Sequence, residues 1–224
     1  MTTAAASTPE RLPARPELCR NQALGSRLAR GLLALFGWRL AFAGFPARQG
    51  VILVYPHTSN WDFPLGVLTK WATGVRAHYW GKDSLFRIPL LGLWMRWIGG
   101  IPVDRANRSG VVASTAEQLR QARERGEDWW LAVAPEGTRA LGTGWRSGAY
   151  QVAVQARAPI ALVSFDFPSR TIRVQDFMQP CGNVEADFAF FREVFKDVRG
   201  YRPELASPIR LKGPKDERSD PEAP

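Results

Sequence analysis

The chain has 224 residues, of which 45% are hydrophobic and 23% are charged. This composition is ordinary for a globular protein, and a chain of this length can bury a core large enough to fold without disulfides or metal ions. Its 2 cysteines and 2 histidines exclude any mechanism that needs three imidazoles and argue against a zinc site or a disulfide scaffold.

Basic residues outnumber acidic ones by 30 to 21, which gives a net charge of +9. In the first fifty residues, seven arginines (Arg11, Arg15, Arg20, Arg27, Arg30, Arg39 and Arg48) stand against Glu10 and Glu17. A basic field of this kind attracts nucleic acid or an anionic membrane surface. Aromatic rings beside cations suit the headgroup boundary of a bilayer, so the 9 tryptophans and 12 phenylalanines favour a membrane, although such rings also stack on unpaired bases.

The amino-terminal region divides into two parts. Residues 1–16 are small, polar and rich in proline, and we expect them to be disordered. Residues 17–48 predict a basic amphipathic helical region that can contact a membrane. Within it, the apolar run Gly31–Phe45 contains Arg39 and is shorter than the roughly 20 residues of a membrane span. We interpret this run as a core helix or an interfacial segment, and a true span is the least favoured alternative.

Strand-like and helical segments alternate over residues 49–200. The predicted strands are Val51–Tyr55, Val75–Trp80, Trp129–Ala134, Pro159–Phe165 and, half exposed and at an edge, Arg170–Phe177. The predicted helices are Asp62–Thr73, Ser84–Ile98, Ser109–Arg125 with Ser109 as its cap, Ser147–Arg157 and Glu185–Arg199. This alternation predicts an α/β domain with a mixed, largely parallel sheet covered by helices. Residues 201–224, with prolines and balanced charges, predict a flexible tail.

The loop after Val51–Tyr55 holds two titratable side chains, and ligands of such folds bind beyond the carboxyl ends of the strands. On one continuous helix His57 and Asp62 would point about 140° apart. Where a loop turns into a helix, however, the carboxylate can fold back onto one imidazole nitrogen and leave the other free to accept a proton. The alternative is a histidine that only packs or caps. Ser59 is interpreted as a cap, because no G-x-S-x-G elbow occurs.

A second polar loop, Pro135–Arg139 (PEGTR), follows the strand Trp129–Ala134. Its glycine lets the backbone approach a ligand, and an arginine can grip a phosphate through two hydrogen bonds. Glu136 would repel a phosphate, so it either orients Arg139 or accepts a hydrogen bond from a substrate hydroxyl. A surface turn with an ion pair is the alternative.

A third block, Gly99–Arg105 (GGIPVDR), follows an apolar segment. Two glycines and a proline specify a particular turn, beside which Arg105 emerges. A structural turn with a solvated arginine is the alternative.

Together, in this order and spacing, the three blocks resemble the glycerophospholipid acyltransferase family, whose best-known members acylate lysophosphatidic acid. HTSNWD (57–62) resembles the catalytic box of the family, and GGIPVDR and PEGTR resemble its second and third blocks. The segments 81–86 and 88–92 resemble its linking stretch, and 146–148 and 158–160 resemble the segments that follow the third block. A short arginine-rich region replaces the long hydrophobic amino-terminal region of larger members.

The resemblance implies a glycerol-3-phosphate acyltransferase-like fold. It also implies an O-acyltransferase that moves a fatty acyl group from acyl-CoA or acyl carrier protein to a lysophospholipid hydroxyl, above all that of 1-acyl-sn-glycerol-3-phosphate. His57 would be the general base and Asp62 would hold its ring, with backbone amides near Asp62 stabilising the oxyanion. The implied substrate-binding residues are Lys82, Arg105, Glu136, Gly137, Thr138 and Arg139. No metal and no cofactor beyond the acyl donor are expected.

The implied partners are the lysophospholipid, the acyl-CoA or acyl carrier protein, and a membrane surface, with no nucleic acid. We expect a peripheral or monotopic protein of phospholipid biosynthesis at the cytoplasmic face of the inner (plasma) membrane. It would dock through its amino-terminal region and the segment 85–97, and the alternative is that the arginines of both are simply solvated. Two alternatives stay open: an acyltransferase for another lysolipid, such as an acylated amino acid, and a non-catalytic basic binding module.

Overall fold

The computed structural model describes residues 8–19, 26–103 and 108–213 of the chain. Their strands form an 8-stranded sheet in the order β1-β8-β7-β3-β6-β4-β5, with β2 also paired to β8. The strands are β1 (Glu10–Leu12), β2 (Arg39–Phe42), β3 (Gln49–Val54), β4 (Ala77–Lys82), β5 (Gly100–Val103), β6 (Trp129–Val133), β7 (Ile160–Asp166) and β8 (Thr171–Gln179). β1 and β7 run antiparallel to β8 and the other pairs are parallel, so the prediction of a mixed, largely parallel sheet is confirmed.

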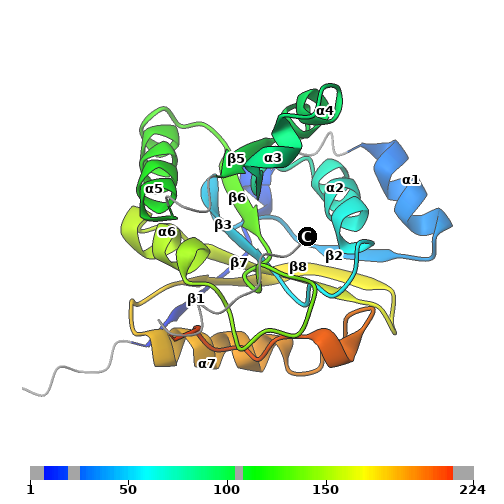
Figure 1. Ribbon diagram of the computed structural model, residues 1–224. Helices are drawn as coiled ribbons and strands as arrows, with labels where there is room; N and C mark the ends of the chain where they lie inside the picture. Colours follow the sequence, from blue (N-terminus) through cyan, green and yellow to red (C-terminus); the bar gives the residue numbers. More distant parts are fainter. Residues whose placement is uncertain (1–7, 20–25, 104–107, 214–224) are drawn as a thin grey trace, which may run out of the picture.

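Helices cover both faces of this sheet (Figure 1). They are α1 (Arg27–Leu35), α2 (Asp62–Thr73), α3 (Asp83–Phe86), α4 (Leu91–Trp97), α5 (Arg108–Glu124), α6 (Gly148–Ala156) and α7 (Val184–Phe195). Helices α5, α6 and α7 pack on one face, whereas α1 and α2 pack on the other. The loops at the carboxyl ends of β3, β4 and β6 therefore lie between two helical layers.

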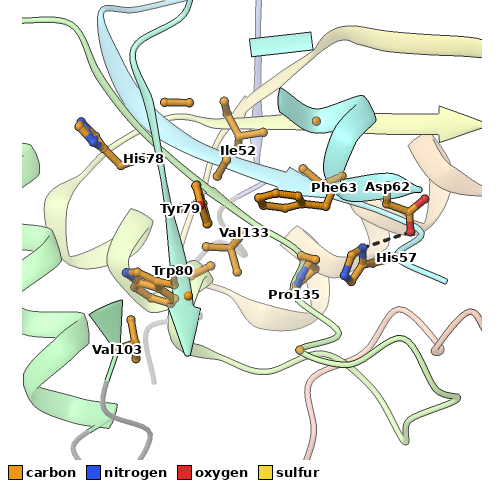
Figure 2. A pocket seen from close by; sticks show the side chains of 18 of the residues that line it. Ile52, His57, Asp62, Phe63, His78, Tyr79, Trp80, Val103, Val133 and Pro135 are labelled. Carbon is orange, nitrogen blue, oxygen red and sulfur yellow. Dashed lines mark ion pairs between the residues drawn. The ribbon is translucent and has the colours of Figure 1, made fainter. Parts of the chain in front are cut away.

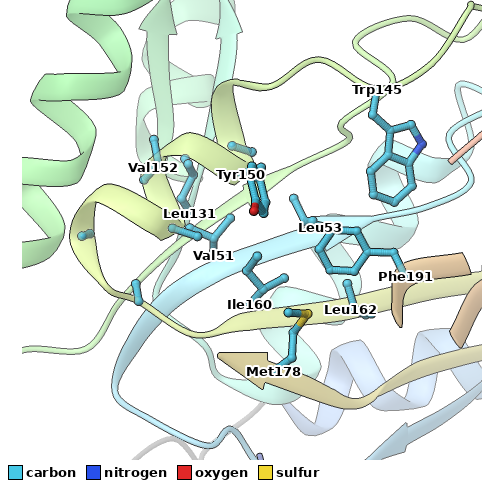
Figure 3. Close-up of a cluster of buried hydrophobic side chains, with 14 of the residues drawn as sticks. Val51, Leu53, Leu131, Trp145, Tyr150, Val152, Ile160, Leu162, Met178 and Phe191 are labelled. Atoms are coloured by element: carbon cyan, nitrogen blue, oxygen red, sulfur yellow. The ribbon is translucent and has the colours of Figure 1, made fainter. Parts of the chain in front are cut away.

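The core lies on both sides of β3 and β7. Val51 and Leu53 belong to the cluster under α5–α7, and Ile52 between them belongs to the cluster under α1 and α2. Figure 3 shows the first cluster, in which Trp145 is fully buried and stacks against Phe191. The uninterrupted apolar run of β3 is what a strand buried on both faces requires.

The helix predicted over Ser84–Ile98 is broken in two. α3 ends before Pro89, which has no N–H and does not fit inside a helix, and Leu90 adopts a φ of 61° before α4 begins. The chain then enters β5, where the sequence predicted only a turn. Two glycines and Pro102 within four residues give a weak strand signal, although a proline is tolerated there because β5 is an edge strand.

The other predicted elements are present with shifted ends. β4 begins at Ala77 instead of Val75, and α7 ends at Phe195 instead of Arg199. α5 begins at Arg108, so Ser109 lies inside the helix and the prediction that it caps the helix is wrong.

The amino-terminal region is partly extended. β1 pairs with β8, so the prediction of disorder is wrong for these three residues of the segment 1–16, while residues 1–7 lie outside the described part. The predicted helical region 17–48 contains α1, but it also contains β2, which runs parallel to β8. Because β1 and β2 both pair with the outer side of β8, β8 is not the edge strand that its alternating pattern predicted.

Residues 200–212, named here the C-terminal strap, pack against the domain. They contain a short 3-10 helix (Pro203–Leu205), and Leu211 forms a bridge to the loop before α6. Ser207 is fully buried, and Leu211 packs against the core cluster under α5–α7. The prediction of a flexible tail is therefore wrong for residues 201–213, and residues 214–224 lie outside the described part.

Large apolar side chains are exposed on both sides of α2. We name them the apolar surface: Leu28, Leu35 and Phe36 at α1, and Leu85, Ile88, Leu90, Leu93, Trp94 and Trp97 around α3 and α4. α2 joins the two groups. It packs on α1, and the ring centroids of its Trp71 and of Trp97 lie 6.0 Å apart. Among the described residues, no helix has the length and hydropathy to cross a bilayer.

Candidate active site

The loop after β3 brings His57 and Asp62 together (Figure 2). Asp62 is the first residue of α2, and its Oδ2 lies 3.2 Å from Nδ1 of His57. A carboxylate at this position holds a proton on Nδ1 and leaves Nε2 without one, as a general base requires. The predicted folding back of the carboxylate onto the imidazole is confirmed, and the catalytic role built on it stays a prediction.

Asp62 is anchored by the loop that it supports. Its Oδ2 accepts hydrogen bonds from the backbone N–H groups of Thr58 and Ser59, both at 2.9 Å. Its side chain is 2% exposed while that of His57 is 18% exposed, so the carboxylate is shielded and the ring remains accessible. Such a carboxylate fixes the orientation of the ring rather than meeting the substrate.

The backbone amides around Asp62 are occupied within the loop. Ser59 Oγ accepts a hydrogen bond from Trp61 N at 3.1 Å within the turn before α2, but Trp61 is the N-cap residue of this helix, so the prediction that Ser59 caps it is wrong. Asp62 N donates to Ser59 O, and the amides of Thr58 and Ser59 donate to Asp62. These four amides therefore do not form the expected oxyanion site.

The other histidine, His78, is a poorer base. It stacks on Trp129 with ring centroids 4.8 Å apart. Burial, and secondly the charge of Lys70, lower the pKa of His78 to about 4. A base with this pKa is poorly matched to proton abstraction near neutrality, so His57 is the better candidate.

Glu136 lies behind the His57 loop. It is fully buried, its Oε2 accepts the backbone N–H of His57 at 2.5 Å, and its Oε1 accepts that of Ser207 at 2.8 Å. Burial raises the pKa of Glu136 to about 7, although the two backbone hydrogen bonds oppose the rise. This position differs from the expectation that Glu136 shapes the acceptor pocket, because it does not line the cavity.

Three cationic side chains line the cavity near the ends of β4 and β6: Lys82, Arg139 and Arg146. Gly137 and Thr138 line it too, as expected. Gly137 has a φ of 68°, and a Cβ atom there would lie 2.4 Å from Nε of Arg146, so only glycine lets this arginine pass. Arg105, the other predicted phosphate ligand, lies outside the described residues.

The cavity has a volume of about 1120 Å³ and its wall is mostly apolar. It extends from His57 between α2 and the sheet, past Ile52, Val54 and Gly66. The hydroxyls of Thr69 and Thr73, which also line it, donate to carbonyls one turn earlier in α2, at 2.7 and 2.8 Å. These hydroxyls are thereby satisfied within the helix, and the wall suits a hydrocarbon chain.

Sequence reasoning missed two contributors to this site. Arg146 belongs to the segment 146–148 that resembles the family, but it received no role, although Gly137 in the same loop makes room for it. Ser207 gave no usable signal, because a buried serine in a proline-rich, charged segment looks like any solvated one.

Comparison with known proteins identifies the family of this chain. The family model described as Acyltransferase matches residues 42–166. The 1-acyl-sn-glycerol-3-phosphate acyltransferase of Escherichia coli (strain K12) is 33% identical over 97 residues, 42% of this chain and 39% of the relative. That of Haemophilus influenzae (strain ATCC 51907 / DSM 11121 / KW20 / Rd) is 32% identical over 113 residues, 49% of this chain and 45% of the relative. The matches thus span less than half the length of these curated relatives.

A solved structure resembles the fold. The 1-acyl-sn-glycerophosphate (LPA) acyltransferase PlsC from Thermotoga maritima superposes with a TM-score of 0.53 and 18% identity, over 80% of this chain and 77% of that chain. The family model covers more than half of the chain, from the last residue of β2 to the end of β7. It includes the loop after β3, which carries His57, and the loop after β6, which carries Arg139. The chain therefore belongs to the Acyltransferase family.

Proposed function

We propose that the protein transfers a fatty acyl group from a thioester of coenzyme A or acyl carrier protein to the free hydroxyl of a lysophospholipid. The proposed acceptor is 1-acyl-sn-glycerol-3-phosphate, on which the named relatives act. The observation that carries the proposal is the His57–Asp62 pair in the wall of a large, mostly apolar cavity that cations also line.

The reaction needs one proton to move twice. Nε2 of His57 takes the proton of the acceptor hydroxyl while its oxygen attacks the thioester carbonyl. The tetrahedral intermediate then expels the thiolate, which takes the proton back from the imidazolium. Asp62 holds the ring and stabilises its charged form, so no acyl-enzyme is required.

The acceptor phosphate suits the basic part of the wall. Arg139 and Arg146 offer planar groups that can bind phosphate oxygens in pairs, and Lys82 adds a point charge. The cavity exceeds the roughly 300–1,000 Å³ of typical small-molecule pockets, so it has room for a hydrocarbon chain beside a polar headgroup.

Both proposed substrates are amphiphiles, so we also propose peripheral docking on a membrane at its cytoplasmic face. The apolar surface carries Trp and Leu side chains, with Arg27, Arg30 and Arg96 on the same helices. Rings and alkyl groups beside arginines suit the headgroup boundary of an anionic bilayer.

The test measures thiol release from an acyl thioester with a panel of acceptors: lysophosphatidic acid, monoacylglycerol without the phosphate, an acylated amino acid, and none. We expect release with lysophosphatidic acid, and a loss of at least about 10²-fold for His57→Ala at an unchanged melting temperature. A folded, fully active His57→Ala protein would contradict the base assignment. Faster thiol release with the acylated amino acid would identify that lipid as the acceptor instead. Thiol release without any acceptor would indicate a thioesterase. No thiol release with any acceptor and with both donor types would favour a binding module.

A further inference from the structure

The C-terminal strap reaches the polar loops through Ser207. Its N–H donates to Glu136 at 2.8 Å, its carbonyl accepts the Tyr55 hydroxyl at 3.0 Å, and its Oγ accepts the N–H of Gly142 at 3.0 Å. Tyr55 directly follows β3, and Glu136 and Gly142 belong to the loop after β6. One fully buried residue therefore connects the loop that carries His57 with the loop that carries Arg139 and Arg146.

A second contact holds the His57 loop from its other side. The N–H of Arg202 donates to Thr58 Oγ1 at 3.2 Å. At Gly200, a Cβ atom would lie 2.5 Å from Thr58 Oγ1 and 2.9 Å from Pro56 Cγ, so the strap packs directly on both neighbours of His57. Two residues before His57 and one after it, Tyr55, Pro56 and Thr58, thus touch the strap.

Glu136 closes the connection at His57 itself. Its two oxygens accept one N–H from His57 and one from Ser207, so a single buried side chain joins the base to the strap. A carboxylate can accept both bonds, whereas an amide side chain offers one acceptor and one donor to the same two N–H groups. None of these contacts is made to the imidazole or to the Asp62 carboxylate directly, so they act on where the backbone of His57 lies.

We propose that the C-terminal strap positions His57 for catalysis, and that Glu136 is the positioning residue through which it acts. This inference rests on the proposed function only for its effect on turnover. A displacement of about 1 Å at a reacting group can cost about 10²-fold in rate. Loosening the strap should therefore lower kcat, while the KM of the acceptor, set by the cations of the cavity wall, changes little.

The test uses the full chain and two variants that weaken different contacts. Glu136→Gln keeps the shape of the side chain and removes one acceptor, and Thr58→Val removes the acceptor of Arg202 while Thr58→Ser keeps it. The matched control is Glu117→Gln on α5, an exposed glutamate. Because the pKa of Glu136 is about 7, assays run at pH 8.5, where its carboxyl is ionised.

We expect kcat to fall about 10- to 10²-fold for Glu136→Gln and Thr58→Val, with KM changed less than about threefold. Thr58→Ser should restore most of the rate, and Glu117→Gln should match the parent protein. The assay temperature lies well below the melting temperature of every variant, so that a merely structural role would leave kcat unchanged.

A second measurement does not depend on activity. The chain has only 2 histidines, so its imidazole NMR spectrum contains one signal from His57 and one from His78. We expect the His57 signal to shift or broaden in both strap variants while the His78 signal stays in place. If kcat and the His57 signal both stay as in the parent protein, or if both signals and the melting temperature change together, the positioning role is overturned. If the parent protein transfers no acyl group, the proposed function fails, and the two signals alone decide about the strap.

Discussion

At the scale of single residues, the unusual feature is a fully buried glutamate with a backbone N–H on each oxygen. Each oxygen of Glu136 accepts one of these N–H groups, and burial raises its pKa to about 7 despite the two hydrogen bonds. The hydrogen bonds hold the geometry, while desolvation penalises the charge.

This pKa makes a prediction about stability against pH. In the unfolded chain Glu136 ionises near its model value of 4.5, whereas in the folded protein it keeps its proton up to about pH 7. The folded state therefore binds more protons between these pH values, and its free energy of unfolding falls as the pH rises across this window, by up to about 1.4 kcal/mol per unit. Below pH 4.5 and above pH 7 the contribution is flat.

The measurement is urea unfolding of the parent protein and of Glu136→Gln from pH 4 to pH 8. The unfolding free energy of the parent protein minus that of Glu136→Gln should decrease as the pH rises from 4.5 to 7. Glu117→Gln serves as the control for a change in net charge, because Glu117 is exposed. A difference that is independent of pH would mean that Glu136 titrates alike in both states.

At the scale of elements, α2 combines two tasks. Its first residue supports the imidazole, and its inner side forms a wall of the cavity through Gly66, Thr69 and Thr73. A Cβ atom at Gly66 would meet only Phe165, at 3.9 Å, so this glycine leaves room that a larger side chain would take.

We predict that Gly66→Val shifts the donor preference towards short chains. The ratio of kcat/KM for palmitoyl over octanoyl thioester should fall about tenfold, because two lost methylene contacts amount to about 1.6 kcal/mol. Gly66→Ala should change the ratio little. Gly31→Val on α1, where a Cβ meets nothing within 4 Å, is the matched control, and an unchanged ratio in Gly66→Val would mean that the chain does not pass α2.

The sequence predicted the long elements best. The buried strands β3, β6 and β7 carry continuous apolar runs and α5 carries an apolar stripe at helical spacing, and each appeared within two residues of its predicted ends. β1, β2 and β5 were missed, because three or four residues hold too little pattern and such strands form only when a partner such as β8 or β4 is already present.

The candidate site was predicted to a similar extent. His57 and Asp62 lie five residues apart in the loop after a predicted strand, so local reasoning sufficed to bring them together. The position of Glu136 depends on Ser207, which lies 71 residues away in a segment without periodicity. Contacts of this separation follow from tertiary packing alone, which is why the strap was interpreted as a tail.

At the scale of the whole molecule, the apolar surface and the C-terminal strap serve different contacts. The apolar surface is exposed and flanks α2, whereas Ala206, Ile209 and Leu211 of the strap pack on the core cluster under α5–α7. A membrane that covers α1 and α4 therefore meets the face that carries α2, not the face of α7 (Figure 1).

We predict that the protein co-sediments with anionic vesicles at low salt, and that Leu90→Ser combined with Leu93→Ser lowers the partition coefficient at least about tenfold. These side chains are 83% and 71% exposed, so the change removes apolar area from the surface with little effect on the fold. Val184→Ser at the start of α7 is the control. If the double leucine variant binds the vesicles as strongly as the parent protein, the docking site lies elsewhere.

Leu85 and Trp94 belong both to the apolar surface and to the wall of the cavity. The membrane-bound protein would thus take lysolipid sideways from the leaflet and return the product to it. The acyl chains of substrate and product would not be exposed to water. Turnover would then follow the mole fraction of substrate in the interface instead of its amount per litre. Diluting the lysolipid with an inert detergent at a fixed total concentration would slow the enzyme, as expected of catalysis confined to two dimensions.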